Sequence, residues 1–245
     1  MPIAYLEPMA SFPQPPDWYT KWEDFDDEYT LTAAASPWIG TALASGTGVM
    51  TADEQYGVLT LSGNATSDNS GYQLQADMEN FALVTGKRSR FAARFKLSDA
   101  TNSHFFVGAS ITDTTICDGA DGIAGLTPTD CVGFYKADDA ATIAIVVKRD
   151  SAVVCNSTLA TLSDDTYYWV MFEVEMTDTA GKGNVSAWVF NGTTGALIAT
   201  SGPISSTTLP YSTEEILDPA VALVSGNATG TKTASVDCIG WQVQR

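Results

Sequence analysis

Apolar and polar side chains alternate with period two in short segments along most of this chain. In the segment 90–97, Phe91, Ala93, Phe95 and Leu97 fall on one side and polar or small residues on the other. Successive side chains of a β-strand point to opposite faces, so this alternation is typical of a strand that buries one face. The pattern excludes a helical domain and predicts an all-β protein.

The strand candidates follow one another at short spacing along the chain. They are 58–61, 90–97, 105–111, 131–136, 142–148, 152–155, 167–176, 185–190, 220–225 and 234–244. Turn-forming clusters of Gly, Asp and Asn separate them, for example at 118–122 and 181–184. Many short strands with turns between them predict a sandwich or a barrel. Residues 21–245 show no linker, so we expect one domain, with one helical turn at 212–215.

Residues 1–20 differ from the rest, because five prolines exclude a helix or a central strand there. Apolar side chains lie between the prolines, so we predict an extended arm that docks on a protein partner. The alternative is an arm that folds back over its own domain. The expected contact residues, in the arm and just after it, are Pro2, Ile3, Tyr5, Leu6, Met9, Phe12, Trp18 and Trp22.

The chain is strongly acidic, with 29 Asp and Glu against 12 Lys and Arg and a formal net charge of −17. Nucleic acids and anionic membranes are bound through clustered positive charge, so we expect neither as a partner. The first residues contain no secretion signal, so we expect synthesis in a cytoplasm, or trimming of the chain.

Five carboxylates crowd the segment from Glu23 to Glu28. Three interpretations stay open: a first strand with an acidic outer face, an acidic patch for a basic partner, or a calcium site. The first is the default, because charge runs are usually solvated. A calcium loop would need a turn-forming glycine, and this segment has none.

The four cysteines form no CxxC pair and His104 is the single histidine, so a zinc site is not expected. Cys117 and Cys131 bracket a Gly- and Asp-rich loop and would close it if they formed a disulfide. Buried free thiols are the favoured alternative. Asp118 and Asp121 in this loop are weak calcium candidates, and a surface turn is the favoured interpretation. We predict no cofactor and no metal.

The order of several segments resembles the concanavalin A-like, or laminin G-like, jelly-roll proteins of tailed-phage virions. These segments are 90–100 with 104–108, 130–136, 168–175 with 185–192, and 234–241. No single segment is specific, and the resemblance spans roughly residues 55 to 245. It implies an antiparallel two-sheet jelly-roll sandwich.

The resemblance also implies a role, because such proteins decorate and cement the outer capsid surface or form parts of fibres. It leads us to expect a non-enzymatic virion protein, made in the cytoplasm of a host bacterium. We expect the arm to bind the shell of major capsid protein. We also expect the chain to self-associate as a homotrimer. Alternatives are a carbohydrate-binding module for a host-surface glycan and a glycan depolymerase.

The depolymerase alternative depends on Glu173 and Glu175, which alternation places on one face of a strand while Phe172, Val174 and Met176 face the core. Retaining glycosidases of this fold carry the pattern Glu-x-Asp-x-x-Glu, and this strand departs from it at its second and third carboxylates. Outward-facing acids are also common in an acidic chain. We therefore predict no catalytic residues.

Overall fold

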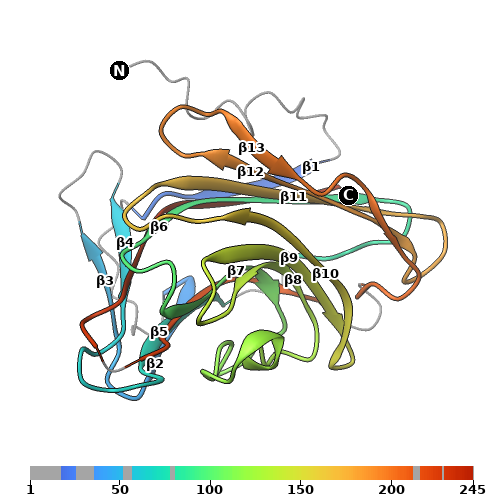
Figure 1. Ribbon diagram of the computed structural model, residues 1–245. Coiled ribbons are helices and arrows are strands. Elements are labelled where there is room, and N and C mark those ends of the chain that lie inside the picture. The colour runs from blue at the N-terminus through green and yellow to red at the C-terminus, as the bar shows by residue number, and fades with distance from the viewer. Residues whose placement is uncertain are drawn as a thin grey trace.

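The computed structural model describes residues 18–25, 36–51, 57–77, 81–211, 216–227 and 229–244. Two antiparallel β-sheets lie face to face, which confirms the predicted all-β sandwich (Figure 1). The one helical element in the described ranges is a short 3-10 turn, η2 (Gly122–Gly125). Within these ranges the chain has no helix of the length and hydrophobicity that a membrane span requires.

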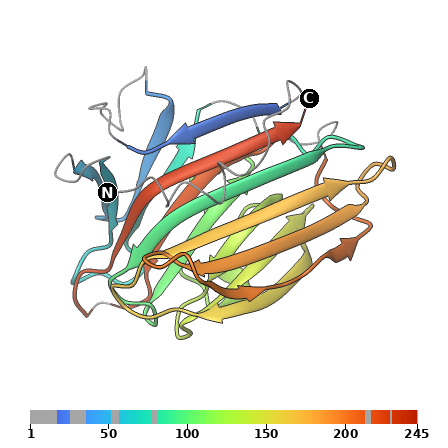
Figure 2. The ribbon, with the colours of Figure 1, turned by 90° about the horizontal axis from the view of Figure 1, so that it is seen from above.

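The nine-stranded sheet contains both the first and the last described strand. Its order is β13 (Leu197–Thr200), β12 (Gly183–Asn191), β11 (Tyr168–Met176), β6 (Arg88–Leu97), β16 (Thr233–Gln244), β4 (Val58–Ser62) and β3 (Thr47–Thr51). β1 (Trp18–Glu23) also pairs with β16, and β14 (Ile204–Ser206) pairs with β12. The long strand β16 therefore joins segments from both ends of the chain (Figure 2).

The seven-stranded sheet forms the second layer. Its order is β10 (Ala152–Thr161), β9 (Thr142–Arg149), β8 (Cys131–Lys136), β7 (Ser103–Ser110), β15 (Asp218–Ser225), β5 (Gly71–Ala76) and β2 (Trp38–Leu43). β15 joins β7 to β5 although it lies more than a hundred residues further along the chain.

The core between the sheets follows the period-two pattern. Phe91, Phe95 and Phe172 are buried in one continuous cluster, and the rings of Phe91 and Phe172 stack at 5.3 Å between centroids. Trp38 from one sheet meets Trp241 from the other in an edge-on contact at 6.3 Å. Burial of such large apolar side chains is the main stabilising term of a sandwich.

The predicted arm adjoins the sandwich through β1, which begins at Trp18 and crosses the expected arm boundary at residue 20. Six consecutive residue pairs join β1 to β16, from Trp18 opposite Gln244 to Glu23 opposite Ile239. The predicted contact residues Pro2, Ile3, Tyr5, Leu6, Met9 and Phe12 lie outside the described residues. So do most of the acidic run, at 26–28, and the predicted helical turn at 212–215.

Candidate functional site

The connection from β7 to β8, residues 111–130, folds over the outer face of the seven-stranded sheet. Ile116 and Leu126 from this loop are buried against Phe106, Val146 and Ala222 of the sheet. Long connections in compact domains often carry function, because the scaffold holds them while they remain accessible. The loop therefore makes this outer face a candidate position for a functional site.

Two buried glutamines of β5 hold the loop to the sheet. The Gln73 side chain donates to the Asp113 carbonyl (2.5 Å) and accepts from the Ile116 amide (2.7 Å). The Gln75 side chain donates to the Ile111 carbonyl (2.8 Å) and accepts from the Asp113 amide (3.0 Å). Both amides thus use donor and acceptor, as buried polar groups do.

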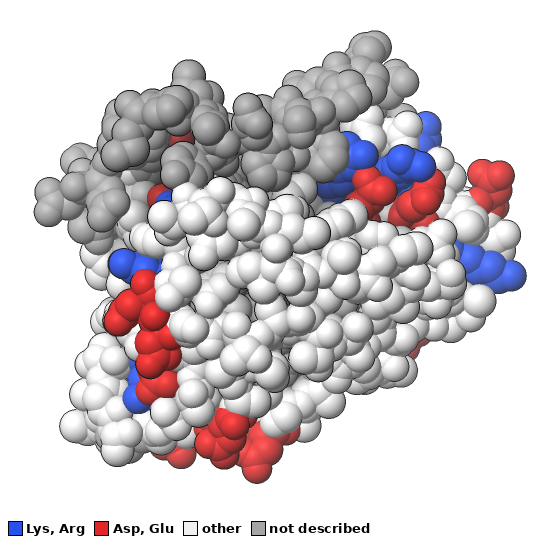
Figure 3. Space-filling view, turned by 45° about the horizontal axis from the view of Figure 1, so that its top comes forward, with Lys and Arg blue, Asp and Glu red and all other residues white. Residues whose placement is uncertain are grey.

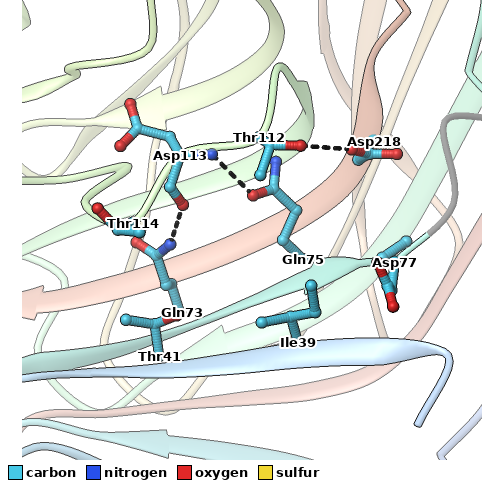
Figure 4. A pocket seen from close by; sticks show the side chains of 10 residues that line it. Ile39, Thr41, Gln73, Gln75, Asp77, Thr112, Asp113, Thr114 and Asp218 are labelled. Atoms are coloured by element: carbon cyan, nitrogen blue, oxygen red, sulfur yellow. Dashed lines mark hydrogen bonds between the residues drawn. The ribbon is translucent and has the colours of Figure 1, made fainter. Parts of the chain in front are cut away.

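A pocket of about 320 Å³ opens where the loop meets β2 and β5 (Figure 4). Its walls come from four separate parts of the chain. They are lined by Ile39, Thr41, Gln73, Gln75, Ala76, Asp77, Thr112, Asp113, Thr114 and Asp218. The size is at the lower end of small-molecule sites, which commonly measure about 300–1,000 Å³.

The pocket combines three carboxylates with hydroxyl groups and one exposed aliphatic side chain. The Thr112 hydroxyl donates to Asp218 Oδ2 (3.2 Å), and Asp113 Oδ1 accepts from the Thr115 amide (2.8 Å), so both acids have fixed positions. Asp77 and Thr41 complete the polar rim, and Ile39 is 45% exposed. The carboxylates and hydroxyls can accept hydrogen bonds from the hydroxyl groups of a ligand, and Ile39 offers it an apolar surface.

The calcium candidates Asp118 and Asp121 lie in the same loop, away from the pocket lining. Asp118 Oδ1 accepts from the Ala120 amide (2.8 Å), the geometry of a surface turn. Asp121 precedes η2 without a side-chain cap. Over the described ranges, no three side chains of metal-binding type come together.

The candidate disulfide residues Cys117 and Cys131 are free thiols in the structure, and both are buried at the loop. Burial raises the pKa of Cys131 to about 12, and it raises the pKa of Cys117 as well. Burial in apolar surroundings disfavours the thiolate, so neither thiol is suited to act as a nucleophile.

Glu173 and Glu175 do point to the outer face of the nine-stranded sheet, while Phe172, Val174 and Met176 lie in the core. Each carboxylate is bound by an arginine of the neighbouring strand β6. Glu173 Oε2 lies 2.6 Å from Arg90 Nε, and Glu175 pairs with Arg88. The hydrogen bond that Arg88 donates to Glu175 raises the pKa of Arg88. Both acids are therefore held against the sheet rather than around a cleft.

Trp18 and Trp22, the described members of the predicted contact set, serve the sandwich itself. The Arg90 guanidinium lies over the Trp18 ring at 4.7 Å, and Trp22 packs against Trp169 with 6.0 Å between ring centroids. Met171 belongs to the same small cluster on the outer face of the nine-stranded sheet. The structure therefore brings these two tryptophans to β1 and not to a free arm.

The sequence alone did not predict the pocket residues as a site. Gln73 and Gln75 alternate with Tyr72, Leu74 and Ala76 in β5, and this period-two signal was present in the sequence. The remaining lining residues stand in loops or on short strands, and no local pattern connects Thr41 with Asp113 or Asp218. Only the fold brings them together.

Comparison with protein-family models and with curated proteins finds no match. Solved structures do match. A protein of unknown function from Shewanella oneidensis MR-1 is 12% identical, with a TM-score of 0.64, over 100% of this chain and 95% of that one. Lectin I from Ulex europaeus, in complex with the methyl glycoside of α-L-fucose, is 12% identical, with a TM-score of 0.56, over 93% and 98%.

A third match is to a phage protein. The CBM2 module of the evolved Dit of Lactobacillus casei BL23 phage J-1 is 9% identical, with a TM-score of 0.54, over 94% of this chain and 98% of that one. At such low identities the matches establish the fold alone. That fold is the concanavalin A-like jelly-roll sandwich that also includes the legume lectins.

Proposed function

We propose that this protein is a non-catalytic carbohydrate-binding jelly-roll domain of a phage particle. The observation that carries the proposal is the pocket between β2, β5 and the loop 111–130. Its carboxylate, hydroxyl and aliphatic groups suit a sugar ring, which has hydroxyl donors at its rim and apolar C–H faces. The shared fold with a lectin and with a phage carbohydrate-binding module supports this proposal.

The charge of the pocket narrows the class of glycan. Asp77, Asp113 and Asp218 surround it, and the whole chain carries a net charge of −17. Like charges repel, so sulfated or uronic-acid polysaccharides are disfavoured. Neutral or amine-bearing glycans of a bacterial surface fit best.

Calorimetry with neutral and anionic oligosaccharides, chosen from a glycan array, tests the site. We expect Asp77→Asn and Thr41→Val to weaken binding of a neutral glycan about tenfold each, because Asp77→Asn replaces a charged acceptor oxygen with an amide donor and Thr41→Val removes a hydroxyl group. Asp139→Asn changes charge equally in an exposed turn outside the pocket lining and serves as the matched control. A flat array, or equal effects of all three variants, would refute the proposal.

Capsid cementing through the N-terminal arm is the second candidate, and the anchoring of β1 favours it. The Arg90 guanidinium lies over the Trp18 ring, and Trp18 pairs with Gln244 of β16. A force on the segment before β1 therefore acts directly on the nine-stranded sheet. Deletion of residues 1–17 spares β1, whereas deletion of 1–20 would remove half of that strand.

Retention on the particle tests the cementing role. We expect the chain without residues 1–17 to keep its jelly roll, monitored by circular dichroism, and to dissociate from particles during sedimentation. Undiminished retention of the truncated chain would count against cementing by the arm.

We also propose that the domain hydrolyses no glycan. Glu173 and Glu175 are each engaged by an arginine and lie outside the pocket. A retaining glycosidase needs two carboxyl groups about 5–5.5 Å apart on either side of the bond to be broken. Release of reducing ends from any bound polysaccharide, abolished by Glu173→Gln or Glu175→Gln, would overturn this view.

A further inference from the structure

Several segments of this acidic chain contain no charged residue, and two of them, including the longest, meet in the fold. Residues 151–163 and 183–211 lack Asp, Glu, Lys, Arg and His, although 17% of the chain is charged. The first segment contains β10, and the second contains β12, β13 and β14. An absence of charge over this length is a marked compositional bias in a protein with a net charge of −17.

The fold brings the two segments together. β10 is an edge strand of the seven-stranded sheet, β13 and β14 are at one edge of the nine-stranded sheet, and β10 contacts β12, β13 and β14. Both sheets thus end on the same side of the sandwich (Figure 2). The broad uncharged surface in Figure 3 is this side, which we call the uncharged edge face.

The uncharged edge face also concentrates exposed apolar side chains. Val153, Leu197 and Ile198 are 45%, 55% and 46% exposed, and they make up half of the large hydrophobic side chains that are exposed in the described part of the chain. Natural edge strands are usually protected from pairing by charged residues, lysine above all. These edges carry no such protection.

We propose that the uncharged edge face binds a second copy of this chain. Two copies with a net charge of −17 repel each other, and the repulsion is smallest where their closest surfaces carry no charge. A basic partner would be drawn instead to the acidic parts of the surface. Self-association is therefore the contact that this charge distribution favours.

The size of the face suits a weak, reversible contact. The ten residues of β10 span about 33 Å at the rise of a β-strand, and packed sheets lie about 10 Å apart. With the side chains around them, the two edges offer several hundred Å² of surface, which approaches the roughly 800 Å² per partner of a standard interface. β2 and β5, which line the pocket, lie at the opposite end of the seven-stranded sheet, so the pocket stays accessible.

Sedimentation equilibrium of the full chain over a concentration series tests the proposal. We expect reversible self-association, and Leu197→Glu and Thr158→Glu should each raise its dissociation constant more than tenfold by placing a carboxylate in the interface. Val49→Glu is the matched control, because Val49 is also 55% exposed and lies on β3, at the other end of the same sheet. Added salt should strengthen the association by screening the net charge.

A wild-type chain that remains monomeric at about 100 µM would overturn the proposal, because the dissociation constant would then exceed that value. Equal weakening by Val49→Glu would overturn it as well, since the effect would then reflect net charge and not this face. Both variant positions are exposed, and circular dichroism confirms their folding before the measurement.

Discussion

Lys136 is a charged residue that the sandwich buries completely. Its ammonium group donates to the carbonyls of Thr101 (3.1 Å), Ala137 (2.9 Å) and Ser103, so backbone oxygens replace the water that it loses. Burial lowers the pKa of Lys136 to about 8, against an opposing effect of nearby carboxylates, of which Asp138 is the strongest.

This buried lysine predicts a specific pH dependence of stability. Its folded pKa of about 8 lies below the unfolded value of 10.5, so between these pH values the unfolded state binds more protons. The free-energy cost of burying the charged lysine is therefore fully present below pH 8, and it decreases as the pH rises to about 10.5.

We expect the free energy of unfolding of wild type, relative to Lys136→Met, to rise by about 3 kcal/mol across this pH range. Urea unfolding at several pH values measures the difference, in which the other titrating groups cancel. A difference that stays constant or falls as the pH rises contradicts the role of burial.

Gly108 shows how closely two backbones approach in the seven-stranded sheet. It pairs with Gly133, and a Cβ atom at position 108 would come within 2.4 Å of the Gly133 Cα and of the Val132 carbonyl oxygen. We expect Gly108→Ala to lower the free energy of unfolding by about 1–3 kcal/mol, since the overpacked strands must separate. Chemical denaturation checks this, and an unchanged midpoint would show that the sheet adapts.

At the scale of elements, the loop 111–130 depends on β5. Gln75 accepts from the amide of Asp113 and donates to the carbonyl of Ile111. We expect Gln75→Leu to destabilise the protein by about 1–3 kcal/mol, because these backbone groups lose their partner. Hydrogen exchange should accelerate at residues 111–116 while β8 and β9 keep their protection.

The comparison with Gln73→Leu sharpens this experiment. Gln73 serves the Asp113 carbonyl and the Ile116 amide, so its loss should loosen the same stretch of the loop. Equal acceleration of exchange throughout the seven-stranded sheet would mean that loop and sheet open as one unit.

At the scale of the whole molecule, the net charge of −17 opposes compactness. Salt screens this repulsion: between about 0.01 M and 0.15 M the Debye length falls from about 30 Å to about 8 Å. We expect the melting temperature to rise over this range, by about 2–4 °C for each kcal/mol gained. A fall in melting temperature would mean that the ion pairs, such as Arg90 with Glu173, outweigh the repulsion.

The long, periodic strands were predictable from sequence, and the short edge strands were not. The segment 131–136 matches β8 in full, and 167–176 differs from β11 by one residue. β2, β3, β13 and β14 were missed, and so was the buried strand β5, although Tyr72, Leu74 and Ala76 alternate there with Gln73 and Gln75. The four edge strands are three to six residues long, and partial exposure leaves them without the strict alternation that burial imposes.

The sequence by itself determined the class of fold and the inward face of its central strands, because alternation is a local property that one segment shows alone. Phe91 and Phe172 faced the core as their patterns required. Tertiary structure alone decided the pocket and the uncharged edge face. Thr41, Gln73, Asp113 and Asp218 meet because strands distant in sequence become neighbours, and no local pattern carries that information.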